Sequence, residues 1–417
     1  MLRIVRSSDR PEVERLFRRR GQRLEEAERS VAPILEAVRQ RGADALIEYG
    51  RRFDGLEDRE LLVPQAELER AAEGLAPEFR RAVETATSQI RAYARLQMPR
   101  SWTETVGEGV RLGQIIRPLD TVGAYVPGGR YPLPSTLMMT VAPAHEAGVR
   151  TVVVTSPKPS AETLGTAGLL GVQRFLRLGG AQAIAALAFG VEPAPKAQRV
   201  VGPGNIYVAA AKKLLAGETG IDFLAGPTEI LLIALEGDAE LLAADMLAQA
   251  EHDVDAAAIL LTTSEELARQ TAEEVERQLA SLPTAAVACE AIRNNSAVVV
   301  VESADEASDL ANRFAPEHLS VPDRSWLDRV ENAGSVFVGR WSPEAAGDYV
   351  AGPNHVLPTG GAATLRGGLS ILDYVKIISV QELDPTGLAR LAPAAVTLAR
   401  AEGLEAHARS IEVRIRD

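Results

Sequence analysis

From residue 121 onward, short apolar runs rich in β-branched residues alternate with segments of helical spacing. The runs are predicted strands: Thr121–Val126, Thr151–Thr155, Arg174–Leu178, Glu229–Ala234, Ala257–Thr262, Ala297–Val301 and Ser335–Val338. Strands that alternate with helices are typical of a parallel sheet in an α/β fold. A second series begins at Glu229 without a detectable sequence repeat, so we predict two α/β halves of similar organisation.

Helical segments flank the two halves. They are rich in Glu, Arg, Ala and Leu at helical spacing. We predict helices over Pro11–Arg20, Glu25–Tyr49, Gln65–Leu96 and, as a C-terminal appendage, Pro385–Arg416. Within the second half, Thr263 with Glu266 and Ser303 with Glu306 predict capping boxes at two helix starts.

Composition excludes several classes of protein. The 417 residues include 45 basic and 57 acidic side chains, and the net charge of −12 argues against binding to nucleic acid or to anionic membranes. No apolar stretch approaches the ~18 residues that a membrane-spanning helix needs. Cys289 is the only cysteine, so no internal disulfide is possible, and a reducing cytoplasm is the expected compartment.

The few histidines lie in unusual contexts. Of the five, His252, His318 and His407 stand close to carboxylates, and His355 follows a Gly-Pro-Asn turn. Imidazoles placed in this way, in a chain otherwise poor in histidine, favour a metal site or an acid/base site.

A divalent-metal site is one interpretation of these residues. Gln249 and His252 are three positions apart on a predicted helix and would share one face. Asp348 is a candidate carboxylate ligand. Imidazole and carboxylate without a thiol suit Zn²⁺ or a similar ion. Gln is a rare zinc ligand and usually a surface amide, however, so spacing alone would not select Gln249 as a ligand.

Glu317 and His318 are adjacent after Phe-Ala-Pro. An acid next to an imidazole in a turn that Pro initiates can act as a proton-transfer pair. The alternative is a helix N-terminus, where the dipole favours Glu. The residues alone leave both interpretations open.

Three glycine-rich turns follow predicted strands in the first half. They are Tyr125–Gly129, Gly179–Gln182 and Val201–Tyr207. Together they could form one ligand crevice at a switch point of the sheet. Each could also be an ordinary tight turn, because the Val201–Tyr207 segment lacks the third glycine of the usual dinucleotide fingerprint.

Longer motifs identify a family that the chain resembles. In order along the chain they are Tyr125–Gly129 (YVPGG), Gly179–Leu187 (GGAQAIAAL), Val201–Lys212 (VGPGNIYVAAAK), Ala225–Ile230 (AGPTEI), Leu247–Asp253 (LAQAEHD), Ala315–Leu319 (APEHL), Ala346–Tyr349 (AGDY), Gly352–Thr359 (GPNHVLPT) and Ala401–His407 (AEGLEAH). From about residue 25 to the C-terminus, the chain resembles the histidinol dehydrogenases.

The resemblance implies an NAD-dependent zinc enzyme of histidine biosynthesis. It would oxidise L-histidinol through L-histidinal to L-histidine with two NAD. The implied zinc ligands are Gln249, His252, Asp348 and His407, and the implied proton-transfer residues are Glu317 and His318. The implied NAD contacts are Tyr125, Gln182 and Asn205, and the implied substrate contacts are Thr228, His355, Glu402, His318 and the zinc ligands.

The resemblance also implies two Rossmann-like domains and an intertwined homodimer. The predicted first domain comprises residues 1–124, with the N-terminal helices, and 234–369. The predicted second domain, on the NAD side, spans residues 125–233, and the predicted dimerisation arm spans 370–417. Shared active sites follow if that arm docks on a neighbouring chain.

Departures from the family pattern leave alternatives. Thr228 stands where many members have Ser, so a related enzyme for another small polar alcohol is possible. Thr364–Leu369 (TLRGGL) also departs from the usual pattern. The residues alone also leave two other classes open. A zinc hydrolase would convert its substrate without NAD, and a non-catalytic protein would bind zinc or NAD without converting a substrate.

Overall fold

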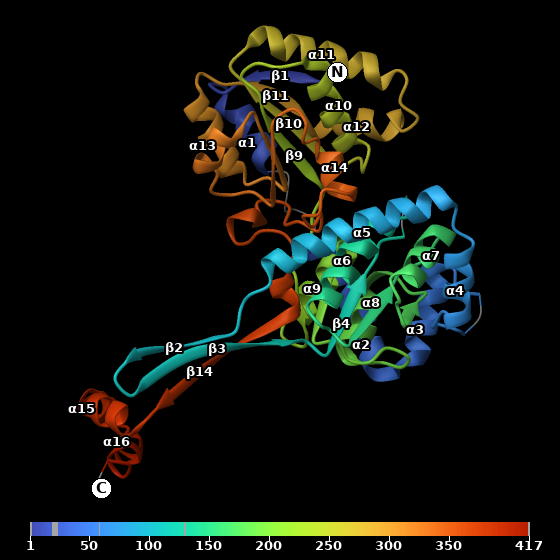
Figure 1. Ribbon diagram of the computed structural model, residues 1–417. Helices are drawn as coiled ribbons and strands as arrows, with labels where there is room; N and C mark the ends of the chain where they lie inside the picture. The colour runs from blue at the N-terminus through green and yellow to red at the C-terminus, as the bar shows by residue number, and fades with distance from the viewer. Residues whose placement is uncertain (1, 19–23, 58, 129–130, 416–417) are drawn as a thin grey trace.

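The computed structural model describes residues 2–18, 24–57, 59–128 and 131–415. Figure 1 shows two α/β lobes, one above the other, and a long arm that extends away from the lower lobe. The N-terminal strand lies in the upper lobe, and the chain ends beyond the tip of the arm. Within the described residues, none of the helices combines the length and apolar composition needed to cross a membrane.

The upper lobe, called here the six-stranded lobe, contains a fully parallel sheet. Its strand order is β1-β11-β10-β9-β12-β13. The strands are β1 (Arg3–Arg6), β9 (Glu229–Ile233), β10 (Ala257–Thr262), β11 (Ala297–Val300), β12 (His318–Val321) and β13 (Ser335–Val338).

Helices cover both faces of this sheet because its central strands are apolar on both sides. On β9, Ile230 and Leu232 pack with one set of helices, and Leu231 and Ile233 pack with the other. The first set is α10 (Ala239–Ala250), α11 (Glu265–Leu279) and α12 (Ala285–Asn295). The second set is α1 (Arg10–Arg18) and α13 (Ala304–Phe314).

The lower lobe, called here the five-stranded lobe, contains the second parallel sheet, with strand order β6-β5-β4-β7-β8. The strands are β4 (Thr121–Tyr125), β5 (Thr151–Thr155), β6 (Arg174–Leu176), β7 (Arg199–Val201) and β8 (Gly220–Ile221). One core contains residues of α4 (Gln65–Glu73), α5 (Pro77–Gln97), α6 (Pro134–Glu146) and α7 (Ala161–Leu169). The other core contains residues of α2 (Leu24–Arg41), α3 (Ala43–Tyr49), α8 (Gly180–Phe189) and α9 (Ile206–Leu215).

This packing differs from the predicted grouping of residues 1–124 with the six-stranded sheet. Of the described residues in that span, only strand β1 pairs with that sheet and only helix α1 packs in its core. Helix α2 instead buries Val31, Leu35 and Val38 in the core that it shares with α8 and α9. The apolar face of α2 was visible in the sequence, but the sequence did not show which sheet it would cover.

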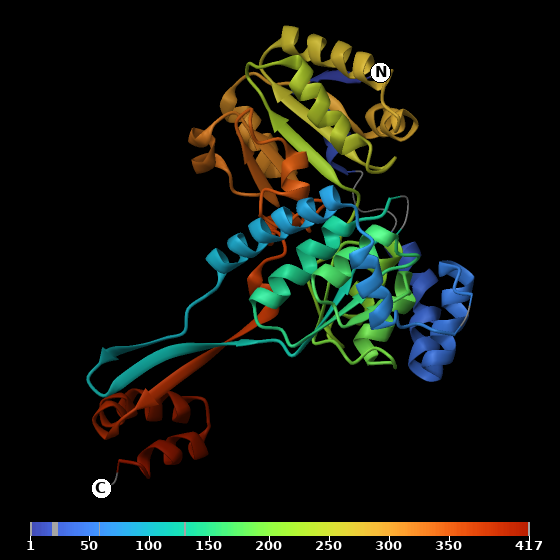
Figure 2. The same cartoon turned by 45° about the vertical axis from the view of Figure 1, so that its right-hand side comes forward.

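The arm is a three-stranded antiparallel sheet capped by two helices (Figure 2). Its elements are β2 (Trp102–Gly107), β3 (Val110–Pro118), β14 (Val375–Leu383), α15 (Pro385–Ala401) and α16 (Glu405–Glu412). The two helices were predicted but the three strands were not. All six residues of β2 are at least partly exposed, so this strand has no alternating burial against a core.

The predicted fold class, two parallel α/β units with helical ends, is confirmed. Some local predictions need correction. The cap of α11 is Ser264, whose Oγ accepts a hydrogen bond from the Leu267 amide (3.1 Å), so the box predicted at Thr263 is wrong by one residue. Ser303 does cap α13, but Glu306 accepts a hydrogen bond from the Glu302 amide rather than from its own cap residue.

Candidate active site

Strand β12 lies between β9 and the edge strand β13 of the six-stranded sheet, and His318 is its first residue. His318 pairs with Ile230 of β9 and with Ser335 of β13, and Glu317 directly precedes the strand. The helix N-terminus considered for Glu317 is therefore wrong. Both residues lie at the amino ends of the strands, whereas ligand crevices of open α/β sheets usually lie at the carboxyl ends.

The His318 ring is held in one tautomer. Its Nδ1 lies 3.2 Å from the backbone carbonyl of Glu229, which can only accept, so Nδ1 carries the proton. Nε2 is buried and has no hydrogen-bond partner among the described residues. Burial lowers the pKa of His318 from 6.5 to about 4. A neutral imidazole with a bare Nε2 is a proton acceptor.

Glu317 is also buried. Its Oε2 accepts hydrogen bonds from the Thr228 hydroxyl (2.6 Å) and from the Glu229 amide (3.0 Å). Burial raises the pKa of Glu317 well above its usual range, although these two hydrogen bonds oppose the shift. Thr228 therefore contacts Glu317 directly.

Glu344 is a member of this cluster that the sequence interpretation missed. It is the first residue of α14 (Glu344–Tyr349) and only 3% exposed, and its Oε1 lies 3.2 Å from His318 Nδ1. Burial, followed by the nearby Asp348 carboxylate, raises the pKa of Glu344 well above its usual range. Its spacing of four residues from Asp348, on one helix face, was the available signal.

Gln249 connects the two buried acids. Its Nε2 donates to Thr228 Oγ1 (2.7 Å), so its oxygen faces Glu344 and that carboxyl group must carry a proton. Turning the amide by half a turn lets Nε2 donate to Glu344 and Oε1 accept from Thr228. Thr228 has one hydroxyl proton, so Glu317 must then be the protonated acid. In either arrangement, one of the two acids holds a proton.

His252 and Asp348 lie next to Gln249 and His318. Helix α10 ends at Ala250, so His252 stands in the turn after the helix that was predicted to carry it. His252 Nδ1 lies 3.0 Å from the Ala248 carbonyl and so carries the proton, and its bare Nε2 lies 3.8 Å from Asp348 Oδ2. A histidine whose other nitrogen donates to a carbonyl is typical of a metal ligand.

The candidate ligands fit a divalent ion in part. His252 Nε2 and Asp348 Oδ2 supply a nitrogen and an oxygen donor 3.8 Å apart, which suits a borderline ion such as Zn²⁺, whereas the Gln249 amide is turned towards Thr228 and Glu344. Among the described residues, no group of three or more His, Cys, Asp or Glu side chains is arranged to hold a metal. The fourth expected ligand, His407, lies in α16, and Glu402 follows the last residue of α15. Both helices are at the tip of the arm, far from α10 and α14 in both views (Figures 1 and 2).

His355 reaches the site, but both of its ring nitrogens are engaged. Nδ1 lies 2.9 Å from the backbone carbonyl of Asp348, and Nε2 lies 3.2 Å from the Thr136 hydroxyl. Burial lowers the pKa of His355. The ring therefore makes two internal hydrogen bonds and presents no free nitrogen to a substrate.

The three expected NAD contacts lie after strands of the five-stranded sheet. Tyr125 ends β4, and its hydroxyl accepts a hydrogen bond from the Gly180 amide (3.2 Å). Gln182 donates to Asp54 (2.9 Å), a buried carboxylate that the sequence interpretation missed. Asn205 caps α9 through the amides of the second and third helical residues. Gly129 of the first glycine turn lies outside the described residues.

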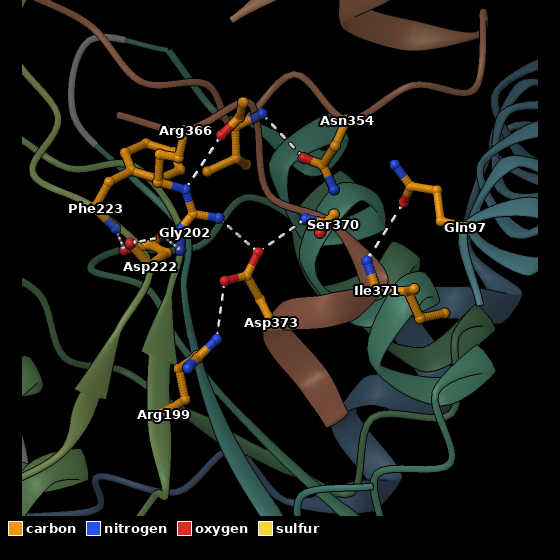
Figure 3. A network of polar contacts seen from close by, with 12 residues as sticks. Gln97, Arg199, Gly202, Asp222, Phe223, Asn354, Arg366, Ser370, Ile371 and Asp373 are labelled. Carbon is orange, nitrogen blue, oxygen red and sulfur yellow. Dashed lines mark hydrogen bonds and ion pairs between the residues drawn. The ribbon is translucent and has the colours of Figure 1, made fainter. Parts of the chain in front are cut away.

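A polar network holds the Gly202 turn (Figure 3). Asp222 accepts hydrogen bonds from the Gly202 amide (2.8 Å) and from Lys212 (2.6 Å). Arg366 donates to the Asp222 carbonyl (2.6 Å) and to Asp373 (2.7 Å). Arg366 belongs to the TLRGGL segment that departs from the family pattern, and here that segment ties the glycine turn to the base of the arm.

Comparison with known proteins decides the family. The sequence profile of the histidinol dehydrogenases matches residues 17–415. The chain belongs to the histidinol dehydrogenase family. It is 47% identical to histidinol dehydrogenase of Thermus thermophilus, with 97% of this chain and 98% of the relative covered, and 46% identical to that of Syntrophotalea carbinolica, with 94% of each covered.

The fold comparison agrees with the sequence comparison. A crystal structure of histidinol dehydrogenase from Elizabethkingia anophelis matches with a TM-score of 0.95 at 34% identity, covering 100% of this chain and 98% of that one. The chain is therefore an oxidoreductase of the histidinol dehydrogenase family.

Proposed function

We propose that this member of the family performs two successive oxidations, from L-histidinol to L-histidinal and then to L-histidine, as the last steps of histidine biosynthesis. The single observation that carries the proposal is the bare Nε2 of His318, on a ring whose Nδ1 lies 3.7 Å from the buried Glu317 carboxyl group. One neutral base and one buried carboxyl group, side by side, can serve two chemically different proton transfers.

The proposed cofactors are one zinc ion per subunit and NAD. Gln249, His252 and Asp348 of one chain, with His407 of a second chain, would hold the zinc ion, which would fix the amine and imidazole nitrogens of the substrate. Tyr125, Gln182 and Asn205 would contact NAD, which would accept a hydride in each step.

In the first oxidation, His318 accepts the hydroxyl proton of the alcohol at Nε2. Its Nδ1–H stays bonded to the Glu229 carbonyl, so the ring keeps its orientation while it becomes charged. Thr228, with its hydroxyl on Glu317, borders the same space and is a proposed substrate contact.

In the second oxidation, the aldehyde must first add water before another hydride can leave. Glu317 takes the proton from that water, since its carboxylate stands next to His318. Because burial raises the pKa of Glu317, its carboxylate is a stronger base than an exposed glutamate.

We also propose an intertwined homodimer with shared sites in the cytoplasm. Glu402 and His407 are exposed and lie at the end of an arm that carries them away from their own chain's site. A second chain would bring them next to Gln249, His252 and Asp348. The reducing compartment is inferred from the lone Cys289.

One assay tests the proposed function. The purified protein with Zn²⁺ and NAD should form two NADH for each L-histidine produced from L-histidinol. Equal or faster turnover of another small polar alcohol would instead identify a related dehydrogenase. Turnover without NAD would overturn the assignment of both oxidation steps.

A further inference from the structure

His355 joins the two lobes. The backbone carbonyl of Asp348 can only accept, so His355 Nδ1 carries the proton and donates to it (2.9 Å). Nε2 of the neutral ring is then an acceptor, and the Thr136 hydroxyl donates to it (3.2 Å). Thr136 lies on α6 in the five-stranded lobe and is 1% exposed. Asp348 lies on α14, whose Gly347 packs against Phe337 of β13 in the six-stranded lobe.

The loop that carries His355 is seated on the five-stranded lobe. Asn354 donates from Nδ2 to the Met139 carbonyl of α6 (2.6 Å), and its Oδ1 accepts from the Val356 amide (2.9 Å). Gly352 has φ +106°, and a Cβ there would lie 3.0 Å from the Gln89 carbonyl of α5. The loop thus sits tightly on α5 and α6, and His355 reaches back from it to the Asp348 carbonyl.

We infer that His355 and Thr136 are positioning residues, which hold the Asp348 end of α14 at a fixed place relative to the five-stranded lobe. His355 would then act on the metal site through Asp348 rather than as a contact to the substrate. The inference rests on the proposed role of Asp348 as a zinc ligand. Partners that orient a ligand typically change metal affinity by about 10–100-fold when they are removed.

Two threonines on the same helix provide a matched test. Thr136→Val removes the hydroxyl that donates a hydrogen bond to His355 Nε2 and keeps the side-chain shape, whereas Thr136→Ser keeps a hydroxyl. Thr140→Val is the control, because Thr140 is equally buried on α6 but its hydroxyl donates to the backbone carbonyl of Thr136 (2.8 Å). All three are made in the full-length protein.

The primary measurement is Zn²⁺ affinity by competition with a chelator, without substrate or NAD. Thr136→Val should weaken Zn²⁺ binding by about tenfold, and Thr136→Ser should recover most of the loss. Thr140→Val should lower the melting temperature without weakening Zn²⁺ binding. Equal Zn²⁺ affinity in Thr136→Val and the wild type, or equal losses in the two valine variants, would overturn the inference.

A double-mutant cycle tests whether Thr136 acts through His355. In a His355→Asn background, Thr136→Val should cost no further Zn²⁺ affinity, because the acceptor of its hydroxyl is gone. Additive losses would show that Thr136 acts by another route. If His355→Asn raises only the KM for histidinol and leaves Zn²⁺ affinity unchanged, His355 is a substrate contact and the inference is wrong.

These outcomes are separable from the proposed function. If Thr136→Val weakens Zn²⁺ binding as expected but the wild type forms no NADH from histidinol, the proposed function alone is refuted. If the wild type oxidises histidinol but Thr136→Val binds Zn²⁺ as tightly as the wild type does, the inference alone is refuted.

Discussion

At the scale of single residues, burial moves the pKa values of His318 and Glu317 in opposite directions. The pKa of His318 is lowered from 6.5 to about 4, and that of Glu317 is raised well above its usual range. Both shifts favour the neutral form, because a charge is poorly solvated away from water. His318 is thus ready to accept a proton at neutral pH, whereas Glu317 becomes a carboxylate only at higher pH than an exposed acid.

This difference predicts separate acid limbs for the two oxidations. As pH falls, alcohol oxidation should decline only when His318 protonates, towards about pH 4. Aldehyde oxidation should decline at higher pH, because Glu317 loses its carboxylate form first. Single-turnover pH profiles with histidinol and with histidinal measure the two limbs. Coincident limbs, or the reverse order, would contradict these roles.

A substitution of Glu317 tests the same division of roles. Glu317→Gln should spare hydride transfer from the alcohol more than from the aldehyde, because only the second step consumes water. Removing a general base typically costs about 10²–10⁴-fold, and we expect that loss in the histidinal step. Thr228 can still donate to the amide oxygen, so the local hydrogen bond is kept. Equal losses in both single-turnover rates would remove the assignment.

The sequence revealed part of this site. The adjacent Glu317-His318 pair and the Gln249/His252 spacing could be recognised, because neighbours in sequence are neighbours in space. Glu344 left only the signal of its spacing from Asp348. Thr136 left none, since it reaches His355 only through the packing of α6. The substrate role of His355 stays a prediction, because the motif did not show that both ring nitrogens make internal hydrogen bonds.

At the scale of elements, the longer apolar strands were predictable, whereas the exposed strands and the short buried strands β7 and β12 were not. β9 and β10 are continuous apolar runs, which mark the centre of a parallel sheet. β14 runs from Val375 to Leu383 with mostly exposed residues, so the sequence carried no burial pattern for it within one chain. Gly42, with φ +55°, divides the single helix predicted over residues 25–49 into α2 and α3.

The helix α9 carries a matched pair of lysines that tests what holds the Gly202 turn. Lys212 pairs with Asp222 at 2.6 Å with side chains 3% and 0% exposed, whereas Lys213 pairs with Glu28 at 2.6 Å with side chains 46% and 20% exposed. Lys212→Met should destabilise the protein by about 3–5 kcal/mol, because Asp222 remains buried without its partner. Lys213→Met should cost about 0–1 kcal/mol.

Urea unfolding of the two variants measures the difference. Lys212→Met should also weaken NAD binding, because Asp222 fixes the amide of the Gly202 turn before Asn205. Lys213→Met should leave NAD affinity as in the wild type. Similar unfolding free energies for the two variants would mean that the buried pair does not hold the turn.

At the scale of the whole molecule, the arm has little core of its own. Trp102, Ile377 and Leu398 are 46%, 51% and 64% exposed on it. Within α15 only Gly387, Ala392 and Ala399 are buried, and within α16 only Ala408. Exposed apolar surface of this kind on a thin arm marks an interaction site. In the proposed dimer, a second copy of the chain would bury this surface and complete the active site.

Shared sites make a sharp prediction for mixed dimers. His252→Ala chains and His407→Ala chains are each expected to be inactive alone, because every site then lacks one of the proposed zinc ligands. If the arm crosses to the neighbour, a mixed dimer has one site with both defects and one site with none. After joint unfolding and refolding with random pairing, half of the dimers are mixed and half of their sites are intact, so roughly a quarter of wild-type activity should return. Each variant refolded alone is the control. If the arm docked on its own chain, every site would keep one defect, and mixed dimers that form without any recovery of activity would show this.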